Sequence, residues 1–270
     1  ESAGTSALVM TFAVYAVAFV ARPVGAVVFG QIGDRIGRRP ALSASIILMG
    51  VATAAIGLLP GYQTIGVAAP LLLILARLLQ GFSAGGELTG ALVFSHEHAP
   101  ATRRGRWVGI VSGTTMLGPA GAAALVLGFQ LMSGDWFEAG GWRWTFIIAG
   151  SGALVGIYLR LKVEETPDFQ ATQRDKPALS PFSELVRDHR RVLVIQFAYF
   201  TVAGLVVHTL VGYVPTYLIE VAEVTSIQSS YAFISGALVA VLSAILTGRM
   251  VDRVGWLIIV RAAVIWTIAS

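Results

Sequence analysis

The stretch Gly30-Gln31-Ile32-Gly33-Asp34-Arg35-Ile36-Gly37-Arg38-Arg39-Pro40 separates two apolar segments and differs from both in composition. Its eleven residues include three arginines, three glycines, one aspartate and one proline. The stretch is too short to fold alone, so we predict a tight polar turn between two helices. A weaker copy, Gly248-Arg249-Met250-Val251-Asp252-Arg253-Val254-Gly255, follows another apolar run. Both copies share the spacing Gly-x-x-x-Asp-Arg-x-Gly, which indicates an internal repeat.

The chain around these turns is much less polar than a soluble domain. Of its 270 residues, 56% are hydrophobic and only 13% are charged, whereas a soluble domain carries about 25% charged residues. The composition therefore predicts an integral membrane protein. The net charge of +4 does not indicate a nucleic-acid partner, because the basic residues lie between apolar runs, where they act as topology signals. The sequence contains no cysteine, so disulfides and thiolate metal ligands are excluded from this chain.

Membrane helices need about 20 mostly apolar residues. Eight segments reach or approach that length: 5–29, 41–59, 66–94, 106–132, 143–161, 191–219, 228–247 and 257–270. The last segment is too short to span at about 1.5 Å per residue. We therefore expect the chain to stop inside a helix.

Lysine and arginine occur in alternate loops only. The loops after the first, third, fifth and seventh segments are rich in arginine, whereas residues 61–64, 135–141 and 220–228 contain no Lys or Arg. By the positive-inside rule, the arginine-rich loops are cytoplasmic and the others external. This orientation places the amino end outside and leads us to expect at least one further helix upstream. The alternative is a complete eight-span protein with an external start.

One cytoplasmic segment, 163–190, combines both charge signs with three prolines. We interpret it as a linker that carries a short surface helix near Pro181 to Arg190. It would divide an N-terminal bundle, 1–162, from part of a C-terminal bundle, 191–270.

Several motifs occur in the order found in a known family. Gly30–Arg39 resembles the loop 2–3 motif of the major facilitator superfamily, and Arg77-Leu78-Leu79-Gln80-Gly81 resembles its fourth-helix Arg-x-x-Gln-Gly motif. The continuation of that run to Glu87, followed by Glu97-His98-Ala99-Pro100, is similar to the metabolite:proton symporter family within it. The resemblance implies an all-α, polytopic membrane bundle of which about eight of twelve helices, the second to the ninth, are present.

Two features depart from the family pattern. Trp256 follows Gly255, where the family has a basic pair. The run Gly118-Pro119-Ala120-Gly121 partly resembles the Gly-Pro motif of drug:proton antiporters. The direction of coupling is therefore left open.

The third apolar segment carries charges inside the predicted span. A charge in hydrocarbon costs roughly 2.5–3.5 kcal/mol, so intramembrane charges usually have a function. Arg77, Gln80 and Glu87 fall on one helical stripe, which predicts a polar substrate or proton path. Arg77 would attract an anionic substrate or tune the pKa of a proton-carrying carboxylate. The alternative for Arg77 is an interhelical hydrogen-bond anchor.

Other polar side chains in the predicted spans are candidates for the same path. His208 is the only histidine within a span and could relay protons, although a neutral, hydrogen-bonded histidine would fit equally. The remaining candidate contacts in the predicted cavity are Gln196, Tyr199 and Tyr231.

The repeated turn suggests a cytoplasmic latch. We expect Asp34 to pair with arginines and with helix termini of a neighbouring cytoplasmic loop when that side is closed. The predicted gate residues are Gly30, Asp34, Arg35, Gly37, Arg38, Arg39, Asp252 and Arg253. The alternative is that the arginines only set topology, which would not explain the glycine and aspartate positions.

The resemblance implies a secondary active transporter that moves a small metabolite, an organic acid or a zwitterion, across the cell membrane by proton-coupled symport and alternating access. The expected partners are the lipid bilayer, the substrate and protons, with a monomeric protein and no cofactor or metal. A proton-coupled antiporter or efflux protein, and a non-transporting sensor, remain as alternatives. A membrane enzyme is not expected, because His96 and His98, at i, i+2, point apart on a helix.

Overall fold

The computed structural model describes residues 2–132, 134–162 and 186–269. All regular elements within these ranges are helical. Most of the predicted linker, at 163–185, lies outside the described residues.

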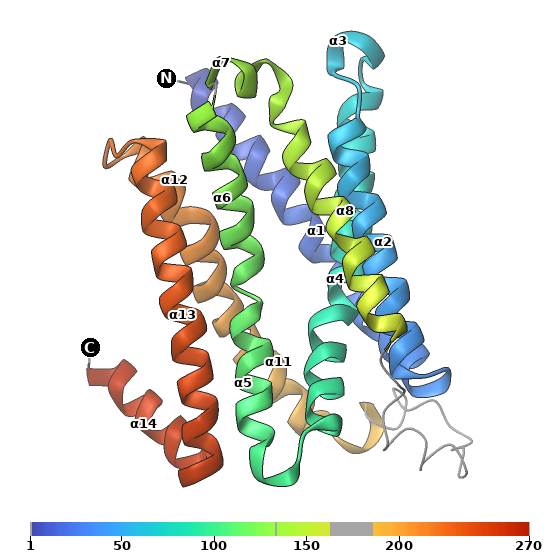
Figure 1. Ribbon diagram of the computed structural model, residues 1–270, viewed down its shortest axis with the longest axis vertical. Helices are drawn as coiled ribbons and strands as arrows, with labels where there is room; N and C mark the ends of the chain where they lie inside the picture. The colour runs from blue at the N-terminus through green and yellow to red at the C-terminus, as the bar shows by residue number, and fades with distance from the viewer. Residues whose placement is uncertain (1, 133, 163–185, 270) are drawn as a thin grey trace. The chain divides into compact units, whose positions relative to one another are not determined.

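The first part of the described chain contains five longer helices and several short ones (Figure 1). The elements are α1 (Ser2–Arg35), α2 (Arg38–Leu58), α3 (Tyr62–Ile65), α4 (Ala68–His98), η1 (Ala101–Arg103), α5 (Arg104–Thr114), α6 (Leu117–Met132), α7 (Gly134–Trp136), η2 (Phe137–Gly141) and α8 (Arg143–Leu161). After the linker follow α11 (Arg190–His208), η3 (Thr209–Tyr213), α12 (Val214–Glu220), α13 (Ser226–Val254) and α14 (Trp256–Ala269).

Seven of the helical runs in the described residues are long and apolar enough to cross a membrane. They coincide with the first seven predicted segments. The eighth predicted segment, 257–270, overlaps a shorter apolar helix at Trp256–Ile265. The prediction of an all-α polytopic membrane protein is confirmed.

The polar stretch Gly30–Pro40 is more helical than a turn. Helix α1 continues to Arg35 and α2 starts at Arg38, so only Ile36 and Gly37 lie between them. Gly37 has a φ of 134°, a backbone conformation that glycine adopts readily because it lacks Cβ. The prediction of an eleven-residue turn was wrong in extent, since one such glycine is enough to separate two helices here.

The second copy ends in the same manner. Helix α13 continues through the motif to Val254, and only Gly255, with a φ of 88°, separates it from α14. The Gly255 N–H donates to the carbonyl of Val251, 3.0 Å away. Both copies are therefore helix ends that carry an aspartate one turn before the terminal glycine.

Prolines coincide with breaks in two long spans. Pro119 cannot donate a backbone hydrogen bond to Thr115, and the span divides there into α5 and α6. The π-helical turn η3 directly precedes α12, whose second residue is Pro215. Such π turns inside a helix are frequent at functional sites.

Burial is inverted relative to a water-soluble protein. Among the side chains that the structure describes, six of the ten buried apolar residues are alanines, whereas large side chains such as Val20, Met132 and Phe197 are 74%, 81% and 76% exposed. Small residues allow helix backbones to approach closely in lipid, where large apolar side chains are solvated by acyl chains. This distribution is that of a membrane protein.

The described chain forms two compact units. Of the described residues, one unit comprises 2–94 and 134–162, and the other comprises 95–132 and 186–269. The predicted bundles 1–162 and 191–270 have different limits, because α5 and α6 pack with α13. The division of the chain into those two transporter bundles stays a prediction.

In the first unit, α2 and α8 pack antiparallel along their lengths (Figure 1). Gly57 of α2 faces the carbonyl of Arg143 at one end, and Gly50 faces Ala153 further along. Helix α4 approaches α1 in the same way, since Gly81 lies against the carbonyl of Ala18. These contacts have no room for a side chain at the glycines.

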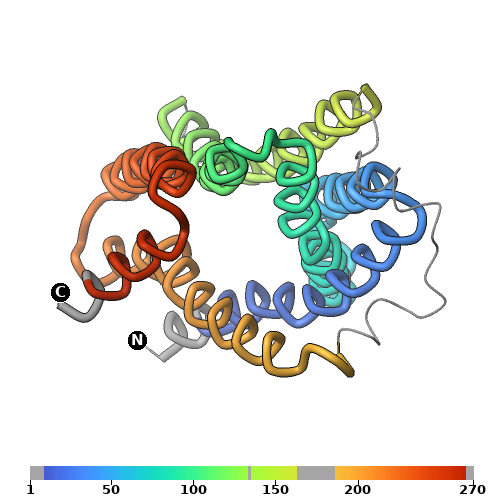
Figure 2. The backbone as a smooth tube through the Cα atoms, turned by 90° about the horizontal axis from the view of Figure 1, so that it is seen from below, coloured from blue at the N-terminus to red at the C-terminus, as the bar shows by residue number. Residues whose placement is uncertain are grey.

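In the second unit, α13 runs alongside α5 and α6 (Figure 2). The contact begins at Gly105 and at Gly248, the first residue of the second motif copy, and continues through Gly109 and Gly113. Helix α12 packs on the opposite end of α13.

The glycine contact between α1 and α4 provides a stability test. A Cβ at Gly81 would collide with the backbone of Ala18, so Gly81→Ala should separate the helices at a cost of about 1–3 kcal/mol. We expect the thermal unfolding midpoint of the purified protein to fall by several degrees. Gly128→Ala on α6 is the matched control, because nothing lies within 4 Å of its Cβ position. Equal midpoints for the two variants would contradict the close contact.

Candidate functional site

The first copy of the repeated motif is closed by an ion pair of its own. Asp34 Oδ1 lies 2.7 Å from Arg38 Nη1, across the break between α1 and α2. The neighbouring Arg39 donates from Nη2 to the carbonyl of Leu161, at 2.6 Å, and so ties the start of α2 to the end of α8. This copy therefore fixes three helix ends on the side predicted to be cytoplasmic.

In the second copy, an aspartate holds a helix terminus. Asp252 Oδ1 accepts from the Gly105 N–H at 2.7 Å, and Oδ2 accepts from the Arg106 N–H at 2.8 Å. Both amides belong to the first turn of α5, where N–H groups have no partner within the helix. A negative charge at that end also interacts favourably with the helix dipole. We call this arrangement, Asp252 with the amides of Gly105 and Arg106, the α5 clamp.

The α5 clamp lies at the end of a glycine-lined contact between α5 and α13. Gly105, Gly109 and Gly113 recur every four residues on α5, and Gly109 lies against Gly248 and the carbonyl of Ala244. In lipid, such a contact is held by close packing and hydrogen bonds rather than by apolar side chains. At these glycines the contact is formed mainly by backbone atoms and small side chains.

The polar stripe on α4 is hydrogen-bonded within its unit. Arg77 Nη1 donates to Gln80 Oε1 at 3.2 Å, and Gln80 Nε2 donates to Thr53 Oγ1 of α2 at 2.7 Å. The Arg77 guanidinium also lies 6.0 Å from the ring centroid of Phe146 on α8. The predicted neighbours Arg77 and Gln80 are thus brought together, and they connect α4 to α2 and α8.

Glu87 has a different charged neighbour. It lies three turns along α4 from Arg77, within electrostatic range of Arg160 in the last turn of α8. Both side chains are partly buried. Opposite charges on two helices offset part of the cost of placing each of them inside a span.

The candidate residues after the linker are less enclosed. Tyr199 and Tyr231 are 64% and 57% exposed, and Gln196 is exposed on α11. His208 is partly buried and is the last residue of α11, immediately before η3. The assignment of these four residues to a substrate or proton path stays a prediction.

Several partners were not expected from the sequence. Thr53, Arg160 and the two amides of the α5 clamp belong to elements far from their partners in the chain. Arg143 Nη1 also donates to the carbonyl of Leu59, at 2.7 Å, and closes the other end of the α2–α8 pair. The sequence offered one signal for Arg160, namely that it is a charged residue in the last turn of a predicted span.

Among the described residues, no group of three His, Cys, Asp or Glu side chains lies close enough together to bind a metal ion.

The chain is similar to known membrane proteins along its whole length. A family model for the Major Facilitator Superfamily matches residues 1–270. The "Putative proline/betaine transporter" of Staphylococcus aureus (strain COL) is 37% identical over 254 residues, which are 91% of this chain and 53% of that protein. The chain thus spans about half the length of this relative.

Two further relatives are also named for transport. A "Glycine betaine/proline/ectoine/pipecolic acid transporter", OusA of Dickeya dadantii (strain 3937), is 37% identical and covers 78% of this chain and 44% of its own. The inner membrane metabolite transport protein YhjE of Escherichia coli (strain K12) is 40% identical, with 71% and 44% covered. Such names are those of transporters rather than enzymes.

Solved structures share the fold at low sequence identity. A double-tryptophan mutant of XylE matches with a TM-score of 0.67 and 19% identity over 94% of this chain and 61% of its own. The proton:xylose symporter XylE with a bound bromo-sugar matches with a TM-score of 0.51 and 16% identity over 92% and 45%.

The α5 clamp leads to a stability prediction. Asp252→Ala should leave the amides of Gly105 and Arg106 without their acceptor and cost about 1 kcal/mol, as for other helix caps. We expect the unfolding midpoint of the purified protein to fall by a few degrees. Glu220→Ala, which removes an exposed carboxylate at the end of α12, should leave it unchanged. An unchanged midpoint for Asp252→Ala would show that the clamp adds no stability.

Proposed function

This chain belongs to the Major Facilitator Superfamily, and from that membership we propose that the whole protein is a secondary active transporter working by proton-coupled symport and alternating access. The chain is part of a multi-pass protein of the cell membrane. Its substrate is proposed to be a small zwitterion or organic acid.

Two observations support the substrate class: the chemistry of a relative's named substrates and the charge on helix α4 of this chain. The named substrates of the OusA relative, glycine betaine, proline, ectoine and pipecolic acid, all carry a carboxylate. The α4 stripe carries an intramembrane cation, Arg77, whose guanidinium is held in place through Gln80 and Thr53. A positioned cation inside a membrane attracts carboxylates, and its cost of burial is offset when an anion pairs with it.

The observation that carries the alternating-access proposal is the α5 clamp. Helices α5 and α13 fall in different predicted bundles, 1–162 and 191–270, yet Asp252 binds the amino end of α5 through two backbone amides. We assign this contact to a state in which the cytoplasmic side is closed. Opening then requires the loss of two charge-assisted hydrogen bonds and the separation of a glycine face, a change small enough for substrate binding to drive.

The proton is proposed to bind at Glu87. Its neighbour Arg160 lies at the end of α8, next to the carbonyl of Leu161 that Arg39 of the first motif binds. Movement of that helix end would therefore change the distance between the Arg160 guanidinium and the Glu87 carboxylate. This link joins the proton site to the cytoplasmic motif through α8.

Antiport is the second candidate. It is favoured by one feature, the Gly118-Pro119-Ala120-Gly121 run at the start of α6, which resembles the Gly-Pro motif of proton-coupled efflux proteins. The direction of proton movement decides between the two.

The central experiment measures substrate-induced proton flux in proteoliposomes with the full-length protein. Proline, glycine betaine and a dicarboxylate are added outside, and internal pH is read with a trapped dye. Symport is expected to acidify the lumen when a zwitterion is added. Alkalinisation would support antiport, and the absence of both flux and uptake would exclude the transporter proposal in favour of a sensor.

Glu87→Gln tests the proton site. The variant should retain exchange of labelled substrate between the two sides, because exchange needs no net proton movement, while accumulation driven by a pH gradient falls at least tenfold. Glu223→Gln is the control, since it removes a carboxylate from the exposed segment between α12 and α13. Gradient-driven accumulation at the wild-type level in Glu87→Gln would rule out this residue as the proton carrier.

Asp34→Asn tests the latch. Loss of the ion pair with Arg38 should reduce the maximal uptake rate several-fold while the protein still inserts into the membrane at normal abundance. Uptake and immunoblotting of membrane fractions measure the two effects separately. Wild-type uptake kinetics in this variant would discard the latch and leave topology as the role of the arginines.

A further inference from the structure

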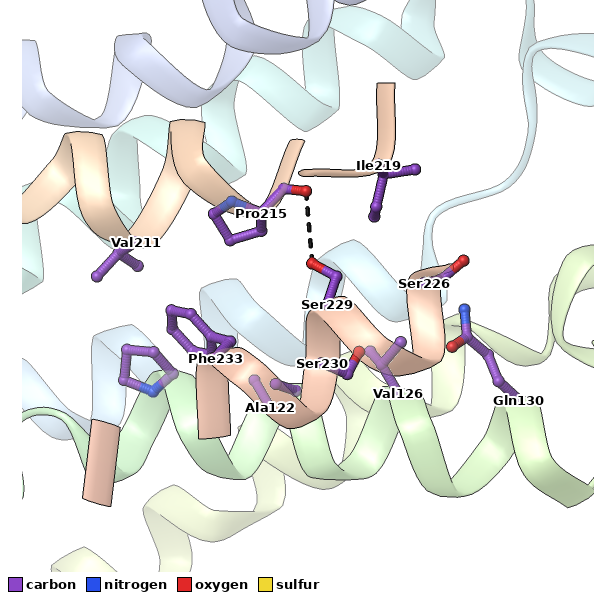
Figure 3. Close-up of a pocket in the computed structure, with 12 residues that line it drawn as sticks. Ala122, Val126, Gln130, Val211, Pro215, Ile219, Ser226, Ser229, Ser230 and Phe233 are labelled. Atoms are coloured by element: carbon purple, nitrogen blue, oxygen red, sulfur yellow. Dashed lines mark hydrogen bonds between the residues drawn. The ribbon is translucent and has the colours of Figure 1, made fainter. Parts of the chain in front are cut away.

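A cavity of ≈ 400 Å³ lies in the second unit, between α6, α12 with the preceding η3, and the first two turns of α13 (Figure 3). This volume is in the range of small-molecule sites. The cavity is separate from the α4 stripe and the α5 clamp, because it shares no lining residue with either. The lining residues are Pro119, Ala122, Ala123, Val126, Gln130, Val211, Pro215, Ile219, Ser226, Ser229, Ser230 and Phe233.

The lining changes from polar to apolar along the helices. Gln130 and Ser226 lie near the helix ends predicted to be external, at the end of α6 and the start of α13. Phe233 lies two turns further along α13, and Pro119 lies eleven residues back along α6, a rise of about 16 Å. A ligand that fits this gradient has a polar head at the external end and an apolar tail directed into the membrane.

The polar end contains an unsatisfied group. Gln130 Oε1 is buried and, among the described residues, has no hydrogen-bond partner. Burying such an atom unpaired costs about 1–3 kcal/mol, so a ligand that supplies a donor there gains that energy. Figure 3 shows the Gln130 amide directed toward the first turn of α13, which carries Ser226.

The serines restrict the head group further. Ser229 Oγ already donates to the carbonyl of Pro215, at 3.4 Å, which leaves Ser226 and Ser230 as the hydroxyls available to a ligand at this end. A ligand hydroxyl can donate to Gln130 and accept from a serine, and it satisfies the amide in either orientation of its oxygen and nitrogen.

Charge is absent from the lining. None of the twelve residues is Asp, Glu, Lys, Arg or His, and an ionised group would lose its hydration without a counter-charge. Glu220 is the last residue of α12 and Glu223 lies in the segment between α12 and α13, so both are close in sequence to the lining residues Ile219 and Ser226. They make the external end still less suited to an anion.

We propose that this cavity binds an uncharged, hydroxylated amphiphile, with the hydroxyl at Gln130 and the alkyl tail toward Phe233 and Pro119. The occupant contacts α6, α12 and α13 at once. The site does not depend on which substrate is transported.

The test uses the full-length protein in lipid nanodiscs and tritiated 1-decanol, with binding read by scintillation proximity. We expect saturable binding to the wild type. Gln130→Leu should weaken it about tenfold, since the head-group hydrogen bond is lost, and Ala122→Trp, which fills the cavity, should abolish it. Gln63→Leu, an exposed amide outside the cavity, should bind as the wild type does.

Competition with matched probes tests the head group. Decanoate at pH 7.5 and decane should each compete at least tenfold less well than unlabelled 1-decanol. Equal competition by decane would mean an alkyl-chain cleft filled by bilayer lipid, and equal competition by decanoate would mean a site that accepts charge. Either result overturns the proposal, as does non-saturable binding or binding unaffected by both Gln130→Leu and Ala122→Trp.

Discussion

The structure depends on how helices associate in a solvent that is as apolar as their own side chains. Hydrocarbon gives leucine and phenylalanine no reason to leave it, so large residues lie on the surface and small ones form the contacts. The α1–α4, α2–α8 and α5–α13 contacts all follow this rule, with glycine against a neighbouring backbone in each. Hydrogen bonds from polar side chains then add attachments between helices that van der Waals packing alone does not provide. Arg39 and Arg143 bridge helices by hydrogen bonds to backbone carbonyls, and Gln80, which accepts from Arg77 within α4, bridges to Thr53 of α2.

The same constraint explains why two helix pairs in this chain are attached in different ways. A contact made by interlocking large side chains has few alternative arrangements, because the interior is densely packed. A glycine face closed by one carboxylate at its end has a single strong point of attachment. The α5–α13 pair is built in this second way, whereas α2 and α8 are joined at both ends, by Arg39 on Leu161 and by Arg143 on Leu59. The two pairs therefore differ in how their ends are attached, α2 and α8 at both ends and α5 and α13 through the α5 clamp at one.

The sequence predicted the helices well and the contacts poorly, for a physical reason. Span length and loop charge are local properties, so seven apolar runs could be located from composition alone. Asp34 pairs with Arg38 of its own motif, four residues along the chain, and its pairing with a neighbouring loop stays a prediction. By contrast, Thr53 meets Gln80 and Asp252 meets Gly105 only after distant helices have packed. The exposed positions of Tyr199 and Tyr231 likewise depend on the surroundings of α11 and α13, which no periodicity encodes. The extent of the Gly30–Pro40 turn was overestimated because a polar composition was taken for an absence of helix.

The partners of Asp252 have a consequence for how this protein can diverge. The carboxylate binds main-chain N–H groups, which every residue except proline provides. Position 105 is restricted by space, since a Cβ there would approach Asp252 Oδ1 to 2.7 Å, but the Arg106 amide stays available whatever side chain other than proline replaces arginine. Substitutions at position 106 therefore leave the hydrogen bond between the backbone amide of residue 106 and Asp252 intact. Methods that detect correlated substitutions between distant positions will consequently find no signal for this one of the two α5 clamp hydrogen bonds.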